Sequence, residues 1–410
     1  MPQTFTVLPY KGQFVQFEEI ESGYLYYLNK RINLLSGETE ETGISALVDI
    51  WKKTQLDQFS DNLHRVLHLF YESSYLFNQL DELLNPLEPL AVCLSYRKRT
   101  LKPTLAADGL KKDWQLIAEK IPSFSRYQKG FRTGYEALKR GDCYQFNLTQ
   151  SYQYQVRKAP TEPLKWLQSF WSEKEDRGAF AHATYLASLD MILLSNSPEC
   201  LFQGIKKGDS FKIISCPIKG TIRIDPKNTE KSFRALKESQ KNLGELNMIT
   251  DLIRNDLSRI DRPVARVEKA QAFLKVPGLY HQYSKISTVI KKQTTLYALL
   301  SALFPGGSIT GAPKKRVMEL LREIEEGPRG FYCGSTLIAS GKMLAASINI
   351  RSGYYWPKTG KLRLFAGGGI TLKSRESAEF DEMNAKCESI LQLMKPKMSV
   401  ISRPERRKNQ

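Results

Sequence analysis

The chain has 410 residues, enough for one large domain or two of ordinary size. Its composition, with 41% hydrophobic, 10% aromatic and 25% charged residues, is that of a globular protein and excludes a mainly disordered chain. The net charge of +18 is compatible with a nucleic acid, an anionic membrane or an anionic small molecule as partner. Because the basic residues are spread along the chain and no DNA- or RNA-recognition motif accompanies them, we expect no nucleic-acid partner.

The chain carries no signal for a membrane or for export. It has no apolar run of about 18 residues, so we expect no membrane span. Its first residues lack a basic patch followed by an apolar run, which argues against a secretory signal. The six cysteines are scattered, without a C-x-x-C pair, and are expected to be free thiols. These features predict a cytoplasmic protein.

Residues 1–110 are predicted to form a β-rich N-terminal region, partly interleaved with the rest of the chain. Short β-like runs lie at 6–8 and 23–27, and an amphipathic, helix-like stretch covers 63–80. His64 and His68 would share one face of that helix. With no cysteine or third histidine nearby, packing is favoured over a metal site for this pair.

Residues 111–396 are predicted to form the main domain, followed by a basic tail at 397–410. The pattern predicts a helix over 114–138, a strand over 143–156, strands within 180–194, a hairpin over 199–214, helices over 228–260, strands near 331–332 and 362–366, and a last helix over 376–394. Hairpins with long helices between them predict an α+β fold.

Two ionisable residues flank apolar strands of this domain. Lys219 lies between an apolar run and Gly220, and a partly desolvated lysine there is a candidate nucleophile. Glu199 lies between a proline turn and an apolar strand, where a raised pKa would make it a general acid. From the local sequence alone, an exposed turn lysine and a strand-edge glutamate are the preferred interpretations of these two residues.

Three acidic or basic residues on predicted helices are candidate ligands. Glu245 lies on the apolar face of its helix without a lysine or arginine three or four residues later, so a metal ion is one possible partner and the helix dipole another. Glu382 and Lys386 are one turn apart. They form either a surface ion pair or a metal ligand beside a substrate-binding cation.

Two glycine-rich segments have backbone N–H groups that suit an anion. Residues 304–314 open a helix, and Gly367, Gly368 and Gly369 precede another. Since the first segment lacks the G-K-[ST] sequence of a phosphate loop, a carboxylate is favoured over a phosphate as the ligand.

Taken together, seven motifs over roughly residues 120–395 resemble the chorismate-utilising enzymes. In chain order they are G-D-C-Y-Q-x-N-L-T-Q, S-P-E-x-x-F, P-I-K-G-T, E-x-x-M-I-x-D-L-I-R-N-D, F-P-G-G-S-I-T-G-A-P-K, I-x-I-R and A-G-G-G-I. The resemblance implies a layered α+β fold, with two packed β-sheets and helices outside. It also implies chorismate as the substrate.

Within that family, two positions distinguish the reactions. The lysine of P-I-K-G-T is similar to that of members that aminate chorismate at C4, whereas members that make anthranilate usually carry alanine. Gln145 stands where isochorismate- and salicylate-forming members have a water-activating lysine. The resemblance therefore implies formation of 4-amino-4-deoxychorismate, for the para-aminobenzoate and folate branch, with ammonia from a separate glutamine amidotransferase subunit.

The resemblance also assigns roles. It implies that Lys219 attacks C2 of chorismate and that Glu199 is the acid and base. Glu245 and Glu382 would be ligands of Mg²⁺. The substrate-binding set that it implies comprises Arg351, Gly368, Gly369, Lys386, Thr310 and Gln145.

Other functions stay open at this stage. They are an anthranilate synthase component I, a basic nucleic-acid-binding protein, and a non-catalytic relative. The last is suggested by Leu337 and Ile338, where a Gly-Tyr pair is common, and by Ser284, where many relatives carry histidine. In the same comparison, nearby His281 does not align with the position at which these relatives carry histidine.

Overall fold

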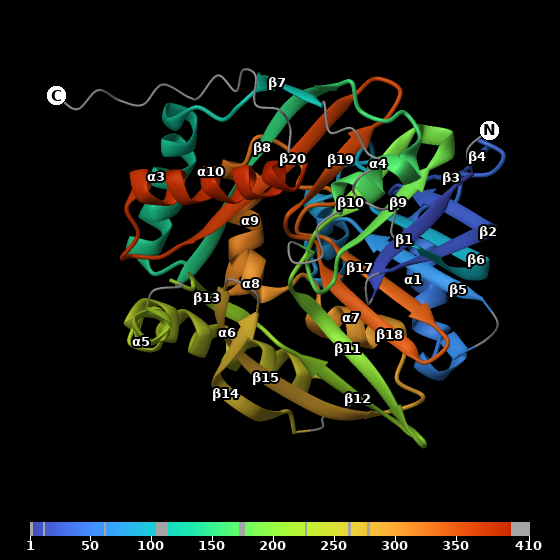
Figure 1. The fold of residues 1–410 in the computed structure, drawn as a ribbon. Helices are drawn as coiled ribbons and strands as arrows, with labels where there is room; N and C mark the ends of the chain where they lie inside the picture. The colour runs from blue at the N-terminus through green and yellow to red at the C-terminus, as the bar shows by residue number, and fades with distance from the viewer. Residues whose placement is uncertain are drawn as a thin grey trace.

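The computed structural model describes residues 3–10, 13–60, 63–103, 114–171, 177–225, 228–260, 264–276 and 279–394 (Figure 1). The predicted domain boundary at residue 110 and the tail at 397–410 lie outside these residues. The α-helices are α1 (Ile44–Lys53), α2 (Ser74–Phe77), α3 (Phe124–Arg140), α4 (Pro163–Phe170), α5 (Thr229–Lys237), α6 (Gln240–Ser258), α7 (Leu296–Leu303), α8 (Gly307–Thr310), α9 (Lys314–Ile324) and α10 (Glu376–Leu393).

The strands are β1 (Phe5–Tyr10), β2 (Gln13–Tyr26), β3 (Arg31–Asn33), β4 (Thr39–Glu40), β5 (His64–Leu69), β6 (Ala91–Pro103), β7 (Gln115–Lys120), β8 (Gln145–Arg157), β9 (His182–Leu186), β10 (Met191–Ser195), β11 (Cys200–Lys207), β12 (Ser210–Ser215), β13 (Ile218–Arg223), β14 (Arg266–Val276), β15 (Leu279–Lys291), β16 (Gly311–Ala312), β17 (Ser335–Ser340), β18 (Met343–Ile348), β19 (Ser352–Trp356) and β20 (Lys361–Ile370). Short 3₁₀ turns lie at Leu56–Ser60, Tyr71–Ser73, Asp81–Leu83 and Ala187–Leu189.

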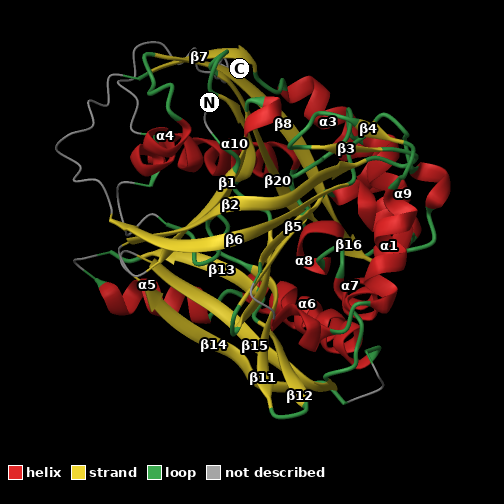
Figure 2. Ribbon diagram, turned by 90° about the vertical axis from the view of Figure 1, so that its right-hand side faces the viewer, coloured by secondary structure: helices red, strands yellow, loops and turns green. Residues whose placement is uncertain are grey.

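The strands form one antiparallel ladder that folds back on itself into two packed sheets. One half runs β8–β20–β19–β10–β9–β1, and β2 and β6 carry the ladder over to β5–β17–β18–β11–β12–β15. Figure 2 shows the strands at the centre and most helices around them. This arrangement confirms the predicted α+β fold. Since β1 pairs with β9 and β5 with β17, the N-terminal strands are part of both sheets.

Three predicted elements are wrong. The expected helix over 114–138 is strand β7 followed by α3, because Pro122 interrupts the chain and the Ser123 side chain caps α3 by accepting a hydrogen bond from the Arg126 N–H. The stretch from 63 begins as strand β5, so His64 and His68 lie on a strand and not on a helix. Residues 331–332 form no strand and precede β17.

No helix within the described residues is long and apolar enough to span a membrane. All six cysteines are free thiols, as expected. Four of them are buried, and Cys93 and Cys216 are partly buried.

Buried histidines and threonines join the two sheets. His68 on β5 and His182 on β9 are at most 1% exposed, and their rings stack with centroids 6.0 Å apart. The Thr336 hydroxyl on β17 lies 2.8 Å from a ring nitrogen of each histidine. The second nitrogen of His68 lies 2.8 Å from the Thr184 hydroxyl. Polar side chains at this depth need such partners.

The partners fix the direction of these hydrogen bonds. His182 Nδ1 lies 2.9 Å from the Phe180 carbonyl, which only accepts, so Nδ1 carries the proton and Nε2 accepts from Thr336. His68 Nδ1 then donates to Thr336, and His68 Nε2 accepts from Thr184. These directions are those of two neutral imidazoles, the form that burial favours. Burial lowers the pKa of His182 to about 4 and holds that of His68 well below its usual value.

We expect the chain to lose stability in mild acid. Below pH 6.5 a histidine of the unfolded chain binds a proton that buried His182 does not take up until about pH 4. Between pH 7.5 and 5.5 this difference lowers the free energy of unfolding by about 1 kcal/mol per buried histidine. Urea unfolding at both pH values measures it. His182→Gln should show a smaller loss than the wild type, whereas His64→Gln, which changes a partly exposed ring, should keep most of it. An equal loss in His182→Gln and the wild type would contradict this account.

Candidate active site

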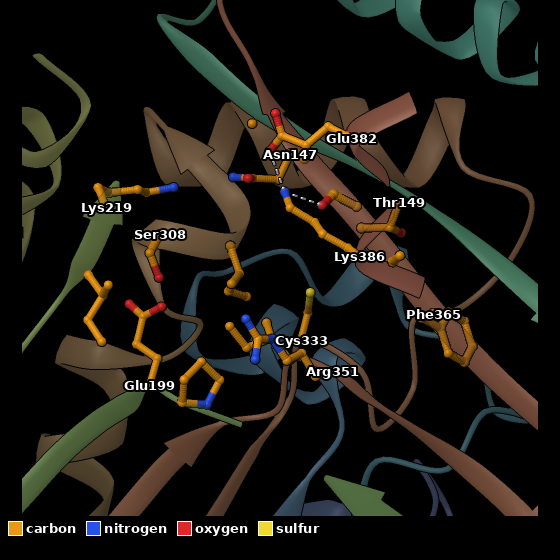
Figure 3. A pocket seen from close by; sticks show the side chains of 18 of the residues that line it. Asn147, Thr149, Glu199, Lys219, Ser308, Cys333, Arg351, Phe365, Glu382 and Lys386 are labelled. Atoms are coloured by element: carbon orange, nitrogen blue, oxygen red, sulfur yellow. Dashed lines mark hydrogen bonds and ion pairs between the residues drawn. The ribbon is translucent and has the colours of Figure 1, made fainter. Parts of the chain in front are cut away.

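A cavity of about 540 Å³ is lined by strands from both halves of the ladder and by helices (Figure 3). Its walls come from β8, β13, β15 and β20 and from α6, α8 and α10. Of the site residues predicted from the sequence, the structure brings eight to this cavity: Glu199, Lys219, Glu245, Arg351, Gly368, Gly369, Glu382 and Lys386.

Glu199 lies at the floor of the cavity, immediately before β11. Its side chain is 6% exposed, and its Oε1 has no hydrogen-bond partner in the structure. Burial raises the pKa of Glu199 to about 7, although the Lys219 charge and the Ser308 hydroxyl act in the opposite direction. Figure 3 shows Ser308 beside this carboxylate. A carboxyl group with such a pKa can exchange a proton near neutral pH.

Lys219 enters the cavity from a bulge in β13. The pairing of β13 with β15 shifts between Ile218 and Thr221, so that Lys219 and Gly220 together oppose the single residue Gln282. Gly220 has φ +83°, which a side chain would strain, and a Cβ there would lie 3.0 Å from Asn242. The bulge thus takes Lys219 out of the regular alternation of the strand.

Helix α10 supplies charged groups to the opposite wall. The Lys386 Nζ lies 2.8 Å from Glu382 Oε1 and donates to the Gly367 carbonyl at 3.1 Å. Glu379, which the sequence analysis missed, is 4% exposed, lines the same cavity and accepts a hydrogen bond from Ser374 at 2.7 Å. The sequence could have indicated Glu379, because it lies one helical turn before Glu382.

The three glycines lie in strand β20 and not in a loop. There they pair with β8, Gly367 opposite Thr149 and Gly369 opposite Asn147. The Gly367 carbonyl accepts a hydrogen bond from Lys386 and so points away from β8. In an antiparallel strand, the N–H and C=O groups of one residue point to the same side, and those of the next residue point to the other side. Gly369 therefore also directs its N–H away from β8, whereas Gly368 directs its N–H towards β8. Of the two predicted donors, only Gly369 can offer its N–H to a ligand.

Glu245 reaches the cavity from the first turns of α6 and is partly buried. Glu382 lines the same cavity from α10. Within the described ranges, no three His, Cys, Asp or Glu side chains are close enough together to form a metal site.

A histidine that the sequence analysis set aside also lines the cavity. His281 on β15 is a lining residue, as is Arg351. Burial and, to a smaller extent, the Arg351 charge lower the pKa of His281, which favours the neutral ring. Ser284, where the family comparison placed the histidine position, is 1% exposed and accepts a hydrogen bond from the Gln271 N–H.

Gln145 and Thr310 lie just behind the lining and not in it. Gln145 is fully buried, its amide is without a hydrogen-bond partner, and a Cβ on Gly369 would lie 2.7 Å from its Nε2. Thr310 is also fully buried and donates to the Gly306 carbonyl. We therefore assign neither a contact with the ligand. Asn147, two residues along β8 from Gln145, does line the cavity, and its Nδ2 has no partner.

A buried arginine joins the segments behind the cavity. Arg329 is 2% exposed and donates to the carbonyls of Asn147 at 2.6 Å and Ile309 at 3.0 Å. It also forms two hydrogen bonds of 2.8 Å with Glu325. The same carboxylate accepts from the N–H and the hydroxyl of Thr149, both at 2.9 Å. One ion pair thus fixes lining residues of both β8 and α8.

The model of the family described as "chorismate binding enzyme" matches residues 56–392. Among curated proteins, the chain is 37% identical over 295 residues to aminodeoxychorismate synthase component 1 of Salmonella typhimurium, with 70% of this chain and 61% of that protein covered. It is 36% identical over 289 residues to the Escherichia coli protein of the same name, covering 69% and 59%. The chain therefore matches about three fifths of the length of these relatives.

Anthranilate-forming relatives are also similar. The chain is 30% identical over 270 residues to anthranilate synthase component 1 of Archaeoglobus fulgidus, with 66% of this chain and 62% of that protein covered. The structure of anthranilate synthase component I from Streptococcus pneumoniae superposes with a TM-score of 0.71 at 18% identity, over 95% of this chain and 92% of that one. This second likeness concerns the fold.

The bulge at Lys219 makes a prediction about stability. Gly220→Ala should lower the free energy of unfolding by about 1–2 kcal/mol, because alanine disfavours positive φ and the new methyl group would press on Asn242. Gly244→Ala is the control: nothing lies within 4 Å of its Cβ position in α6, so it should stabilise by up to about 1 kcal/mol. Urea denaturation measures both. Equal effects would show that the bulge does not require glycine.

Proposed function

Because the chain belongs to the family of chorismate-binding enzymes, we propose that it aminates chorismate at C4 with ammonia to give 4-amino-4-deoxychorismate. The observation that carries this proposal is the primary amine of Lys219 in the same cavity as the protonatable carboxyl of Glu199. An amine and an acid on either side of one substrate suit covalent catalysis of a substitution.

In the first half of the proposed reaction, the neutral amine of Lys219 attacks C2 of chorismate. The ring double bond shifts, and the C4–O bond breaks. Glu199 donates its proton to the departing hydroxyl, which leaves as water. The carboxylate that results accepts the proton that the alkylated Lys219 nitrogen releases.

In the second half, ammonia forms the new bond to C4. The double bond shifts back, and the C2–N bond breaks with its electron pair on the Lys219 nitrogen. That nitrogen takes up the proton released by the new C4 ammonium group. The sum is chorismate plus ammonia giving the amino compound plus water, with the enolpyruvyl ether retained. Two displacements replace one difficult direct substitution.

The cavity offers cations and N–H groups for the two carboxylates of chorismate. Arg351 can hold one carboxylate as a two-pronged donor, and Lys386 with the Gly369 N–H can hold the other. The unpartnered amide of Asn147 adds a further donor. Desolvated donors of this kind would favour an anionic substrate.

Glu245 and Glu382 are the residues that we propose to hold Mg²⁺. Carboxylate oxygens are the donors that this ion prefers, and it usually keeps several positions for water and substrate oxygens. Two carboxylates that line one cavity from different helices fit such a partial shell. When bound, the ion would neutralise charge on a substrate carboxylate.

The proposed source of ammonia is a separate glutamine amidotransferase subunit. The similar curated proteins are named as component 1, which supports a second component. An anthranilate synthase reaction, in which pyruvate is also eliminated, would leave a different product in the same assay.

The test of this proposal is product analysis of the purified chain with chorismate, Mg²⁺ and ammonium. We expect 4-amino-4-deoxychorismate by mass spectrometry, no activity with glutamine in place of ammonium, and a Lys219–substrate adduct on the intact protein when ammonia is left out. Lys219→Ala should abolish the adduct and lower amination at least about 100-fold. Lys212→Ala, which removes a lysine of β12 paired with Glu268, is the control and should keep both. Anthranilate as the main product would reject the proposal.

The raised pKa of Glu199 predicts how the first half-reaction responds to pH. Because the acid form is needed and exists below about pH 7, the rate of adduct formation should fall as the pH rises above that value. Glu199→Gln should lower this rate by about 100-fold or more and lose the alkaline fall. Glu268→Gln, outside the cavity on β14, should behave like the wild type. Rapid-quench measurements of the rate of adduct formation from pH 6 to 9 test this prediction. If Glu199→Gln had the wild-type pH dependence, another group would donate the proton to the leaving hydroxyl.

A further inference from the structure

A second, smaller cavity continues the first along the same face of two paired strands. Side chains two residues apart on a strand share a face. On β8 these are Asn147, Thr149, Ser151 and Gln153, which the register places opposite Gly369, Gly367, Phe365 and Arg363 of β20. Asn147, Thr149, Gly367 and Gly369 line the main cavity. Ser151, Gln153 and Arg363 line a second cavity of about 80 Å³. The two cavities are therefore successive parts of one trough.

Two side chains form the partition between the cavities, since Thr149 and Phe365 line both. The Thr149 hydroxyl is held by Glu325 at 2.9 Å, and the Phe365 ring stacks on Tyr332 at 5.5 Å. Figure 3 shows Thr149 and Phe365 at the same end of the main cavity, beyond Lys386. Opposite Phe365 in the register is Ser151, whose small side chain leaves room in the trough.

The smaller cavity is polar and carries an excess of positive charge. Four basic side chains line it, Lys120, Arg126, Arg329 and Arg363, against the acidic Glu325 and Glu326. Both acidic groups are already paired, Glu325 with Arg329 and Glu326 with Arg126. The buried Nε of Arg363 has no hydrogen-bond partner. The size suits water-sized molecules and not a ring acid.

We propose that this smaller cavity is the port through which ammonia reaches the substrate, as neutral NH3 passing between Thr149 and Phe365. The proposal rests on the proposed function, because amination needs a second, small reactant while chorismate fills the main cavity. The guanidinium of Arg363 disfavours ammonium and leaves the uncharged molecule, which is also the form whose lone pair reacts. Hydroxyl and amide groups at Thr149, Ser151 and Gln153 offer hydrogen bonds along the way.

The test uses the two halves of the reaction, since only the second consumes ammonia. Ser151→Trp would fill the port. We expect its kcat/KM for ammonium to fall at least tenfold, while the KM for chorismate and the rate of Lys219 adduct formation without ammonia stay within twofold of the wild type. Gln155→Trp is the control, because Gln155 lies on the same face of β8 but lines neither cavity, and it should retain the wild-type kcat/KM for ammonium.

A reversible modification distinguishes a blocked port from misfolding of the Ser151→Trp variant. Ser151→Cys should aminate like the wild type, lose at least tenfold in kcat/KM for ammonium after modification with a bulky methanethiosulfonate, and recover with dithiothreitol. The wild-type chain treated in the same way controls for its own cysteines. If modified Ser151→Cys or Ser151→Trp had the wild-type kcat/KM for ammonium, the proposal that ammonia enters through the smaller cavity would be wrong. If the untreated wild type forms neither adduct nor amination product, the proposed function itself fails and the port with it.

Discussion

The buried ion pair between Arg329 and Glu325 is the interaction on which the cavity depends. A guanidinium at this depth is tolerated only because carboxylate and carbonyl oxygens surround it. The acceptors belong to segments that are distant in sequence, so the arginine fixes their spacing. Through Glu325 the same pair orients Thr149, which separates the two parts of the trough. Glu72 extends the network by accepting from the N–H groups of Arg329 and Gly330.

Electrostatic conditions differ between the two ends of the main cavity. At the floor, burial leaves Glu199 with a pKa near neutrality and without a partner for one oxygen. At the α10 wall, Glu382 and Lys386 form a partly exposed ion pair. A weakly acidic group at one end and an ion pair at the other suit a site where a proton moves near the floor and a carboxylate binds at the α10 wall.

The sequence predicted the individual motifs of the site well but not their arrangement. Lys219 and Glu199 stand out because each adjoins an apolar strand and a turn. The bulge that turns Lys219 into the cavity depends on the register with β15, which no local pattern encodes. His281 was set aside because the family comparison placed the histidine position at Ser284, yet His281, opposite Thr221 in the register, lines the cavity. Gln145 and Thr310 occupy suitable motifs, yet lie one layer behind the lining.

The fold was predictable where contacts are local and not where they are distant. The hairpin of β11 and β12 follows from its turn, and α10 from its periodicity. Strand β7 was missed because a short strand directly before a proline and a helix looks like part of that helix. The pairing of β5 with β17 joins regions with no common sequence signal. Such pairing follows from the packing of whole sheets.

The ladder has a consequence for how the molecule acquires its shape. Contacts such as that between His68 and Thr336 join residues 268 positions apart, which gives the fold a high contact order and predicts slow, cooperative folding. Strand β5 emerges from the ribosome long before its neighbour β17, so its edge stays open during most of synthesis. The cavity needs β20 and α10, which are the last two elements within the described residues. A nascent chain therefore has no complete cavity to offer until α10 has been made.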